Sequence, residues 1–475
     1  MEYLGWILFG IVVGVVVGVL ATKWIASRTG SGQSGEVSEL LKMHFHPLPM
    51  NDITISQRQF PFRVRADLQR AIDRLFGETT RIKHFCGVRR EYSHDGVTLS
   101  DCMLESQHSP TLSTPPEYEE LDIGEAQPIR VLQNGLWLLE KDGINFAVLL
   151  APAGRYGQSI GMQFQIAAPN LEEGTKVAQD FFRHLEDSIL KSESYRGKIL
   201  SLEQSAHSYT GQSNGITVHK LRYVERDQVI LPKNTVALLE RNVIQFVKQR
   251  AKLSSFRQAT KKGLLFYGPP GTGKTHTIHY LARALEGHTT LLISAEQVGL
   301  LSEYMTLARL LQPSIVVIED VDLIARDRSQ MNSPCEEVLL NKLLNEMDGL
   351  KEEADILFIL TTNRPEALEA ALAARPGRID QAIEFPLPDD EGRAKLVRLY
   401  SQGVALSEEG IAEITKRTEN VSASFIKELM RRIVQFHIEA DGTGMVTHMD
   451  IDNALDEMLF KGGMLNLKLL GARTH

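Results

Sequence analysis

The stretch GLLFYGPPGTGKT (residues 263–275) joins a short apolar run to a turn rich in glycine and proline. The apolar run, residues 263–268, has the composition of a strand buried inside a sheet. The turn, residues 268–275, matches GxxxxGK[ST], a pattern that binds phosphate when it lies between a strand and a helix. Residues 275–287 continue with a helical pattern that closes at a glycine. The sequence therefore predicts a strand, a phosphate loop and a helix in succession.

Each residue type in this turn has a physical role. Glycines let successive backbone N–H groups turn toward one anion, and the positive end of the following helix faces the same anion. We expect Lys274 to reach the β- and γ-phosphates of a nucleotide and the Thr275 hydroxyl to ligate Mg²⁺. The candidate nucleotide-binding residues are Gly268, Pro269, Pro270, Gly271, Thr272, Gly273, Lys274 and Thr275.

A second apolar run, IVVIED (residues 315–320), ends in two acids, Glu319 and Asp320, and Asp322 follows closely. Its β-branched residues predict a strand that is buried on both faces. From residue 227 onward, strand-like and helical segments alternate, which predicts an α/β fold with a parallel sheet. Such sheets bind ligands at the carboxyl ends of their strands. We therefore expect the acids and the phosphate loop to lie close together.

Three further segments extend the pattern: LLNEMDGL (343–350), TTNRPEALEAALAARPGRID (361–380) and FPLPDDEGR (385–393). Together with the phosphate loop and the acidic strand, they resemble the AAA family of ATPases, part of the larger AAA+ group. The resemblance covers residues 227–459. It implies a core that hydrolyses ATP with Mg²⁺ over residues 227–387, and a helical lid with a C-terminal tail over residues 388–475.

The resemblance also implies roles for single residues. Asn363 matches the sensor that positions the attacking water, and Arg375 and Arg378 match arginines that reach the γ-phosphate held by a neighbouring subunit. Because such arginines act between subunits, the resemblance implies a homo-oligomeric ring, usually of six. An ordinary surface ion pair is the alternative for these arginines. The implied catalytic residues are Lys274, Glu319, Asp320, Asn363, Arg375 and Arg378, and the implied metal ligands are Thr275 and Glu319.

Family members usually end the acidic strand in Asp and then Glu, and here the order is inverted. By position, Glu319 takes the metal role and Asp320 the role of the base. A displacement of about 1 Å at a positioned group can cost on the order of 10²-fold in rate, so one alternative is an ATP-binding scaffold or switch with little turnover. The same Glu-Asp order is familiar in membrane-anchored members similar to the mitochondrial ATPase that assembles respiratory complex III. That resemblance favours an active enzyme.

Two segments depart from the family pattern. Residues 298–300, Val-Gly-Leu, stand where threading members carry an aromatic loop that points into a central pore. Residues 420–425 match the lid motif only loosely and contain no arginine sensor. The zinc-protease motif HExxH does not occur after Gly349, which argues against proteolysis by this chain.

The N-terminal segment has a different composition. Residues 4–22 contain no charge and are long enough to cross a hydrocarbon core of about 30 Å, so they predict a transmembrane helix. No positive residue precedes them, which argues against a cleaved signal peptide. Lys23 and Arg28 follow the span and Glu2 precedes it, so the remainder is expected in the cytoplasm, with a bacterial inner membrane favoured over a mitochondrial one. Residues 27–39 are small and polar and predict a flexible tether.

Residues 40–226 predict an α+β domain. Two apolar runs around Asp142-Gly143 (residues 137–150) predict a β-hairpin, residues 161–168 a further strand, and residues 171–190 a helix. His44 and His46 have no partner cluster nearby, which argues against a metal site. The net charge of −8 gives no reason to expect nucleic acid.

These observations combine into one prediction. The chain is expected to be a membrane-anchored ATPase that remodels, unfolds or translocates a protein client, which the sequence does not identify.

Overall fold

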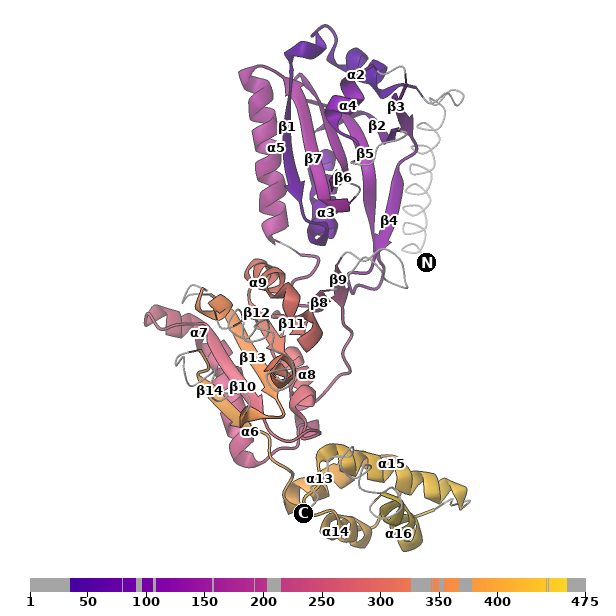
Figure 1. Ribbon diagram of the computed structural model, residues 1–475, viewed down its shortest axis with the longest axis vertical. Coiled ribbons are helices and arrows are strands. Elements are labelled where there is room, and N and C mark those ends of the chain that lie inside the picture. Colours follow the sequence, from indigo (N-terminus) through magenta and orange to yellow (C-terminus); the bar gives the residue numbers. More distant parts are fainter. Residues whose placement is uncertain are drawn as a thin grey trace, which may run out of the picture. The chain divides into compact units, whose positions relative to one another are not determined.

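The computed structural model describes residues 35–78, 80–90, 96–105, 108–155, 158–191, 193–202, 215–325, 343, 345–349, 354–366, 378–440, 442 and 444–458. The predicted span 4–22, residues 27–34 of the predicted tether and Arg375 lie outside these residues. In the part of the chain that is described, no helix is both long enough and apolar enough to cross a membrane. The chain divides into two compact units. Figure 1 labels their helices and strands and colours the chain along the sequence.

The first unit comprises Met1–Glu120 and Arg130–Ser188. Its sheet has the order β1-β7-β6-β5-β2-β3, and β4 pairs with β5. The strands are β1 (Ile53–Phe60), β2 (Arg81–Arg90), β3 (Thr111–Thr114), β4 (Glu117–Leu121), β5 (Ile129–Lys141), β6 (Ile144–Arg155) and β7 (Gln158–Pro169). The helices are α2 (Val37–Phe45), α3 (Arg65–Glu78), α4 (Leu99–Met103) and α5 (Glu172–Lys191).

The predicted hairpin is confirmed by the antiparallel pair of β5 and β6, whose last pair is Lys141 with Ile144. The two turn residues, Asp142 and Gly143, have φ values of 51° and 79°. Both values are left-handed, as a two-residue hairpin turn that matches the strand twist requires. The strand over residues 161–168 and the helix over 171–190 are also confirmed, as β7 and α5.

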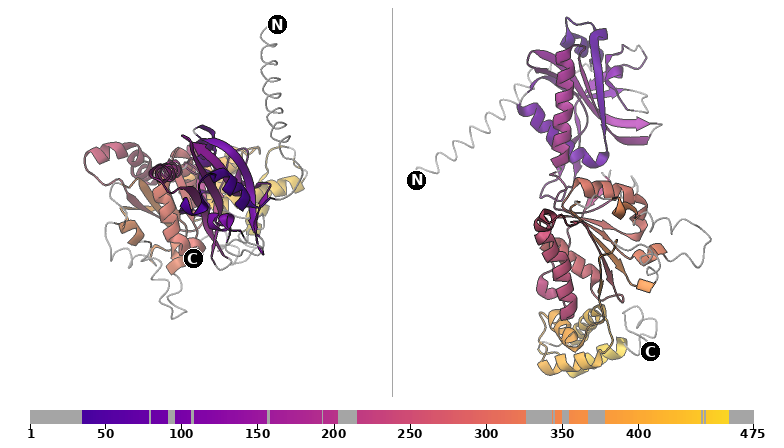
Figure 2. Two further views of the ribbon diagram at one scale, coloured as in Figure 1. Left: turned by 90° about the horizontal axis from the view of Figure 1, so that it is seen from above. Right: turned by 90° about the vertical axis from the view of Figure 1, so that its left-hand side faces the viewer.

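Helices cover both faces of this sheet. Neighbouring residues of a strand point to opposite faces, so they contact different helices. On one face, Ala147 and Leu149 of β6 belong to a buried cluster with residues of α2 and α4. On the other face, Phe146 packs against Phe181 of α5, with ring centroids 5.2 Å apart. Figure 2 shows α5 lying along the sheet.

His44 has a structural role in this unit. Its side chain is buried, and its Nε2 lies 3.0 Å from the Phe146 carbonyl oxygen. Across the described residues, no group of three His, Cys, Asp or Glu side chains is placed to hold a metal ion.

The second unit comprises Leu121–Ile129 and Ile189–His475. Its sheet has the order β14-β10-β13-β12-β11-β8-β9. The strands are β8 (Ile199–Leu202), β9 (Ile216–Val218), β10 (Lys262–Tyr267), β11 (Thr289–Ile293), β12 (Ser314–Ile318), β13 (Ile356–Thr362) and β14 (Gln381–Glu384). All neighbours are parallel except β8 and β9, so the predicted parallel sheet is confirmed.

Helices also cover both faces of this second sheet. The helical segments are α6 (Lys233–Leu239), the π-helix η4 (Glu240–Gln245), α7 (Phe246–Ser255), α8 (Lys274–Ala284), the 3₁₀ helix η5 (Ala295–Leu300), α9 (Leu301–Leu310) and α10 (Val321–Ala325). One buried cluster joins Leu239, Val243 and Leu281 to the strand residues Ile315 and Val317. Residues of α9 pack on β11 and β12 from the other side.

The sequence predicts a domain boundary between residues 226 and 227. The structure divides the chain at Ser188 and Ile189, and it assigns Leu121–Ile129 to the second unit as well. The reason is hydrogen bonding across the sheet edge, because Ile199 and Leu200 of β8 pair with Thr290 and Leu291 of β11. Leu200 and Leu202 are fully buried there. Two strands that lie within residues 40–226, the range expected to form the α+β domain, therefore complete the sheet of the second unit.

The C-terminal part of this unit is a helical lid, as expected. Its helices are α13 (Asp390–Tyr400), α14 (Glu408–Arg417), α15 (Ala423–Glu439) and α16 (His448–Asp456), and they share one buried apolar core. Asp389, Ser407, Ser422 and Thr447 each accept a backbone N–H at the start of one helix. These caps satisfy N–H groups that have no partner within the helix.

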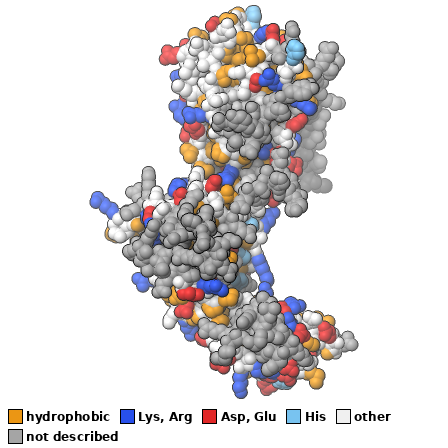
Figure 3. Space-filling model, in the orientation of Figure 1, with side chains coloured by type: hydrophobic (Ala, Val, Ile, Leu, Met, Phe, Trp, Pro, Cys, Tyr) orange, Lys and Arg blue, Asp and Glu red, His pale blue; other side chains and the backbone are white. Residues whose placement is uncertain are grey.

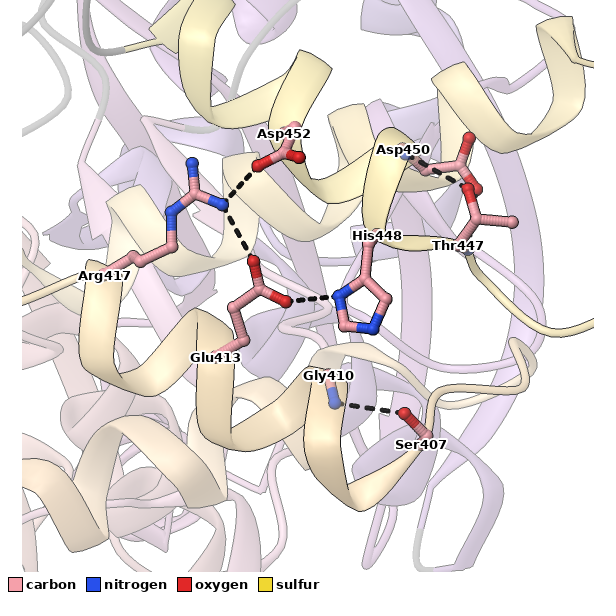
Figure 4. A network of polar contacts seen from close by, with 8 residues as sticks. All are labelled: Ser407, Gly410, Glu413, Arg417, Thr447, His448, Asp450 and Asp452. Atoms are coloured by element: carbon pink, nitrogen blue, oxygen red, sulfur yellow. Dashed lines mark hydrogen bonds and ion pairs between the residues drawn. The ribbon is translucent and has the colours of Figure 1, made fainter.

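Polar contacts also join α14 to α16 on the lid surface (Figure 4). Arg417 pairs with both Glu413 and Asp452, and Glu413 accepts from His448 at 2.6 Å. Figure 3 shows basic and acidic side chains interspersed on the face of the lid that it draws. Exposed pairs of this kind typically contribute less than about 1 kcal/mol each, so the apolar core and the caps hold the lid together.

Candidate functional site

The phosphate loop connects β10 to α8 and depends on glycine at specific positions. Gly268, Gly271 and Gly273 have φ values of 148°, 76° and 98°. A Cβ at Gly268 would lie 2.2 Å from the Phe385 carbonyl oxygen, and one at Gly271 would lie 2.8 Å from the Ser424 hydroxyl. Any larger residue would displace the loop at these two positions. The loop therefore has the curled backbone that an anion-binding site requires.

Lys274 is the first residue of α8, and its side chain lies inside the loop. Its Nζ donates to the carbonyl oxygens of Gly268 and Pro269 at 2.8 and 3.0 Å, and to Asn363 Oδ1 at 2.8 Å. Burial lowers the pKa of Lys274 to about 8, although Asp320 and Asp322 raise it in part. A bound phosphate would favour the charged form and oppose that lowering.

Glu319, which follows β12, and Thr275, the second residue of α8, come together. The Thr275 hydroxyl donates to Glu319 Oε1 at 2.8 Å. Hydroxyl and carboxylate oxygens are ligands that Mg²⁺ accepts, and Mg²⁺ needs only one or two of them because water and phosphate oxygens complete its shell. This pair therefore fits Mg²⁺ beside a bound polyphosphate.

Asp320 and Asn363 link the ends of β12 and β13. The Asn363 amide donates from Nδ2 to Asp320 Oδ1 at 2.9 Å while its Oδ1 accepts from Lys274. The Asp320 backbone N–H donates to the Thr361 hydroxyl at 3.0 Å. Asp322 is fully buried, and its Oδ1 accepts from the Thr362 hydroxyl at 2.9 Å. A hydrogen-bonded chain thus runs from Lys274 through Asn363 to Asp320.

The backbone at position 320 offers a reason for the inverted order of the two acids. Asp320 has a φ of 50°, in the left-handed region. Among residues other than glycine, Asp and Asn are several-fold enriched there, because their short polar side chains can hydrogen-bond locally. Asp is therefore better suited than Glu to this turn between β12 and α10.

The lid closes one side of the loop. The Gly271 carbonyl oxygen accepts from the Ser424 backbone N–H at 3.1 Å and faces its hydroxyl at 3.3 Å. A cavity of about 160 Å³ lies between Gly271–Gly273, the segment 228–231, and residues of α13 and α15. His276, which lines it, contacts the Gln228 carbonyl oxygen at 3.2 Å, and burial lowers its pKa. The cavity extends from the phosphate loop to an apolar wall formed by Val229, Ile230 and Leu396.

Of the two arginines expected to reach a γ-phosphate, Arg378 is among the described residues, and it lies away from the phosphate loop. Arg378 forms an ion pair with Asp348, and its side chain is 10% exposed. It lies beside Gly263, where a Cβ would come within 2.1 Å of the Arg378 carbonyl oxygen. Gly263 is near the start of β10, whereas the phosphate loop follows the end of this strand. Arg378 is therefore not part of the nucleotide site of its own subunit, and Arg375 is outside the described residues.

Residues 298–300 do not form a projecting loop. They lie in the 3₁₀ helix η5, where Val298 is 2% exposed. The preceding Gln297 donates to the Leu202 carbonyl oxygen at 2.8 Å, and the Tyr304 hydroxyl accepts from the Leu202 N–H at 2.7 Å. The added strand β8 thus holds this segment in place.

Several site residues were not found from sequence. Thr361 contacts Asp320 and Thr362 contacts Asp322, and the signal for these threonines was available as a polar pair that ends an apolar strand. Ser424 and the segment 228–231 had no such signal, because only the fold brings them to the loop.

Part of the chain matches a known protein family. Residues 264–387 match the family described as "ATPase family associated with various cellular activities (AAA)". A proteasome-activating nucleotidase of Methanopyrus kandleri is 37% identical over 216 residues, covering 42% of this chain and 48% of that protein. One from Methanococcus vannielii is 30% identical over 276 residues, covering 56% of this chain and 63% of the relative.

A relative with a different name matches the same part of the chain. The ATP-dependent zinc metalloprotease FtsH of Mycoplasmopsis synoviae is 33% identical over 233 residues, covering 46% of this chain and 34% of that protein. The chain spans about half the length of the nucleotidases that it matches.

Proposed function

We propose, given that the chain carries an ATPase domain of the AAA family, that the protein hydrolyses ATP to remodel other proteins. One observation carries this proposal. Lys274 of the phosphate loop, Asn363 at the end of β13 and Asp320 at the end of β12 form one hydrogen-bonded chain, and Glu319 lies beside Thr275. A nucleotide held by the loop would thus meet a cation, a metal-binding pair and a base.

The residues divide the work of hydrolysis. The loop amides and Lys274 hold the phosphates, and Thr275 with Glu319 would hold Mg²⁺, which supplies neutralisation of phosphate charge when it is bound. Asp320 accepts a proton as water attacks the γ-phosphorus, and the bond to the ADP oxygen breaks. Asn363 positions the water and orients the Asp320 carboxylate. The products are ADP and inorganic phosphate.

The test uses the full chain purified in detergent. We expect ATP and ADP to bind and phosphate to be released with Mg²⁺ present, and Lys274→Ala to abolish binding. Absence of nucleotide binding, or binding that is equal in the wild type and in Lys274→Ala, would overturn the proposal.

A second candidate is an ATP-binding scaffold with little turnover. The observation that favours it is the short Asp320 side chain, which is already held by Asn363. Turnover per subunit separates the two candidates, since robust hydrolysis that is lost in Asp320→Asn eliminates the scaffold. Nucleotide binding with no turnover above that of Asp320→Asn supports it.

A protein client is part of the proposal. The names of the relatives refer to a proteasome and to a metalloprotease, both of which act on proteins. We expect an Asp320→Asn trap, crosslinked in the native membrane, to retain a client that wild type releases. Identical crosslinked species in the trap and in Lys274→Ala would contradict ATP-dependent engagement.

Assembly into a hexameric homo-oligomeric ring and anchoring by residues 4–22 complete the proposal, with the ATPase unit in the cytoplasm. The Glu-Asp order supports a place in the branch that resembles the complex III assembly ATPase. Residues 4–22 lack any charge, which supports the anchor. After alkaline extraction, we expect the full chain in the membrane pellet and a variant that lacks residues 1–34 in the supernatant. Recovery of both in the supernatant would rule out the anchor.

A further inference from the structure

A groove of about 540 Å³ lies in the helical lid, where the chain passes from α15 to α16. Its apolar lining includes Met445 and Met449, which are 59% and 72% exposed, and Phe436. Among the described residues that line it, the carboxylates are Glu439 and Asp450, and none is a lysine or arginine. Methionine side chains adapt to irregular apolar partners. The groove therefore suits an apolar segment that also carries positive charge.

The floor of this groove is held by buried polar contacts. The side chain of His437 is buried, and its Nδ1 lies 3.0 Å from Asp450 Oδ2. Asp450 Oδ2 also accepts the Thr447 backbone N–H at 2.9 Å, and Figure 4 shows these two residues at the start of α16. Gly442 lies against the His437 ring, since a Cβ there would come within 2.4 Å of it. The groove is thus formed in advance, so a segment that binds does not have to order it.

An exposed face of α16 leads from the groove to the end of the described lid. Met449, Asn453 and Asp456 are exposed, and their spacing of four and three residues places them on one face of the helix. The Asp456 carboxylate has no hydrogen-bond or ion-pair partner among the described residues. Because α16 is about 14 Å long, a chain that leaves it at Met458 can return to Met449 within about five extended residues.

The sequence that follows α16 has the matching composition. Residues 459–475, LFKGGMLNLKLLGARTH, lie outside the described part of the chain. Residues 464–470 are mostly apolar, and Gly462-Gly463 before them is suited to a tight turn. The segment contains no acid, and its basic residues are Lys461, Lys468 and Arg473. Its charge is therefore opposite to that of the groove and of the α16 face.

We propose that the groove is the docking site of the chain's own C-terminal segment, in which residues 464–470 return along α16 and cover Met445 and Met449. Fully extended, residues 459–475 span roughly 55 Å, which is ample for this path. Burial of leucine side chains against the methionines supplies the main attraction, and Lys468 adds a smaller electrostatic one. This inference goes beyond the proposed nucleotide function and does not depend on it.

The test is disulfide crosslinking in the full-length protein in detergent. Met449→Cys is combined with Leu467→Cys, and the crosslinked peptide is quantified by mass spectrometry. The matched control combines Lys395→Cys with Leu467→Cys, because Lys395 is an exposed residue on α13 of the same lid that does not line the groove. We expect the Met449 pair to crosslink at least about tenfold faster, since docking raises the local concentration of the segment.

A charge reversal in the segment tests the electrostatic part. Added to the Met449 pair, Lys468→Glu should slow crosslinking about threefold at about 50 mM salt and much less at about 500 mM salt, because salt screens exposed charges. Arg473→Glu makes the same change of charge outside residues 464–470 and should slow it less.

Three results would overturn the inference. The first is equal crosslinking rates for the Met449 pair and the Lys395 pair. The second is a product that runs as a covalent dimer on a denaturing gel, which would assign the groove to the segment of a second copy. The third is an unchanged rate in Lys468→Glu at low salt. The proposed function fails separately, if wild type and Lys274→Ala do not differ in nucleotide binding.

Discussion

Asp320 leaves β12 with a φ of 50° and donates its N–H to Thr361, while its carboxylate accepts from Asn363. The residue type at this position is therefore constrained twice, by the backbone and by the chemistry proposed for the carboxylate. Glu319, one residue earlier, has the longer side chain and reaches Thr275. In the inverted order, the longer Glu319 side chain reaches Thr275, and Asp320 occupies the left-handed backbone position that Asp tolerates better than Glu.

Substitution of Asp320 tests these two constraints separately. Asp320→Asn removes the base, so ATP turnover should fall by at least about 100-fold while ATP affinity changes by less than about twofold. Asp320→Glu keeps the carboxylate but lowers the free energy of unfolding by about 1 kcal/mol, because Glu is less suited to a left-handed turn. Phosphate release, nucleotide titration and urea unfolding measure the three quantities. Unchanged turnover in Asp320→Asn would remove Asp320 from the mechanism.

The lowered pKa of Lys274 predicts that the stability of the nucleotide-free protein depends on pH. Its pKa in the folded state is about 8, lowered by burial from the ordinary value of 10.5. Between these two pKa values the unfolded chain binds more protons than the folded chain. The contribution of Lys274 to the free energy of unfolding therefore rises with pH. Relative to Lys274→Met, wild type should gain on the order of 2 kcal/mol from pH 8 to pH 10.5.

Nucleotide supplies the control for this pH dependence. Saturating ADP should suppress the gain, because bound phosphate keeps Lys274 charged in the folded state. The measurement is urea unfolding of both proteins across the pH range. Parallel curves for wild type and Lys274→Met without nucleotide would contradict the lowered pKa.

At the level of elements, β8 and β9 extend the parallel sheet beyond β11. The end of β8 is fixed to α9 and η5 through Leu202, whose N–H donates to Tyr304 and whose carbonyl accepts from Gln297. Lys198, just before β8, donates to the Ile123 carbonyl oxygen at 2.6 Å. These contacts explain why residues 121–129, far away in the chain, belong to the ATPase unit.

Tyr304 tests the strength of this attachment. Its side chain is fully buried, and its hydroxyl also donates to the Leu292 carbonyl oxygen at 3.0 Å. Tyr304→Phe leaves buried backbone groups without this partner, so the free energy of unfolding should fall by about 1 to 3 kcal/mol. Tyr280→Phe, at a partly exposed position, should change it by less than about 0.5 kcal/mol. Equal urea midpoints for Tyr304→Phe and wild type would show that the network adds no stability.

At the scale of the whole molecule, the expected contact between an arginine and the γ-phosphate requires assembly of several subunits. Arg378 is paired with Asp348 near the start of β10, away from the loop of its own chain. The proposed ring would supply such a group from a neighbouring subunit, where it stabilises charge that develops during transfer. Hydrolysis should then depend on assembly.

Complementation between two inactive variants tests this dependence. Arg378→Ala should bind ATP normally and hydrolyse it at least about 100-fold more slowly, because an arginine supplied in trans contributes about 10³ or more. Lys274→Ala should not bind ATP but still carries Arg378. Mixed rings should therefore recover part of the turnover, measured as phosphate release after subunit exchange. If mixing restores nothing while mixed rings form, Arg378 acts only within its own subunit, through Asp348.

Local sequence patterns were enough to predict the features that depend on neighbouring residues. The phosphate loop, the buried strands around it, the hairpin at Asp142-Gly143 and the acids that end β12 were predictable because glycine, β-branched and turn residues act on their own neighbourhood. The parallel order of the strands then brought Lys274 and Glu319 to one edge without further information.

The folded chain was needed to show which distant segments complete these elements. It placed β8 and β9 in the ATPase sheet, brought Lys427 and Ser424 beside the loop, paired Arg378 with Asp348 and gave Asp320 its left-handed backbone. The physical reason is that hydrogen bonds across a sheet edge and contacts between a lid and a loop join residues far apart in the chain. Short-range sequence patterns carry no record of such partners.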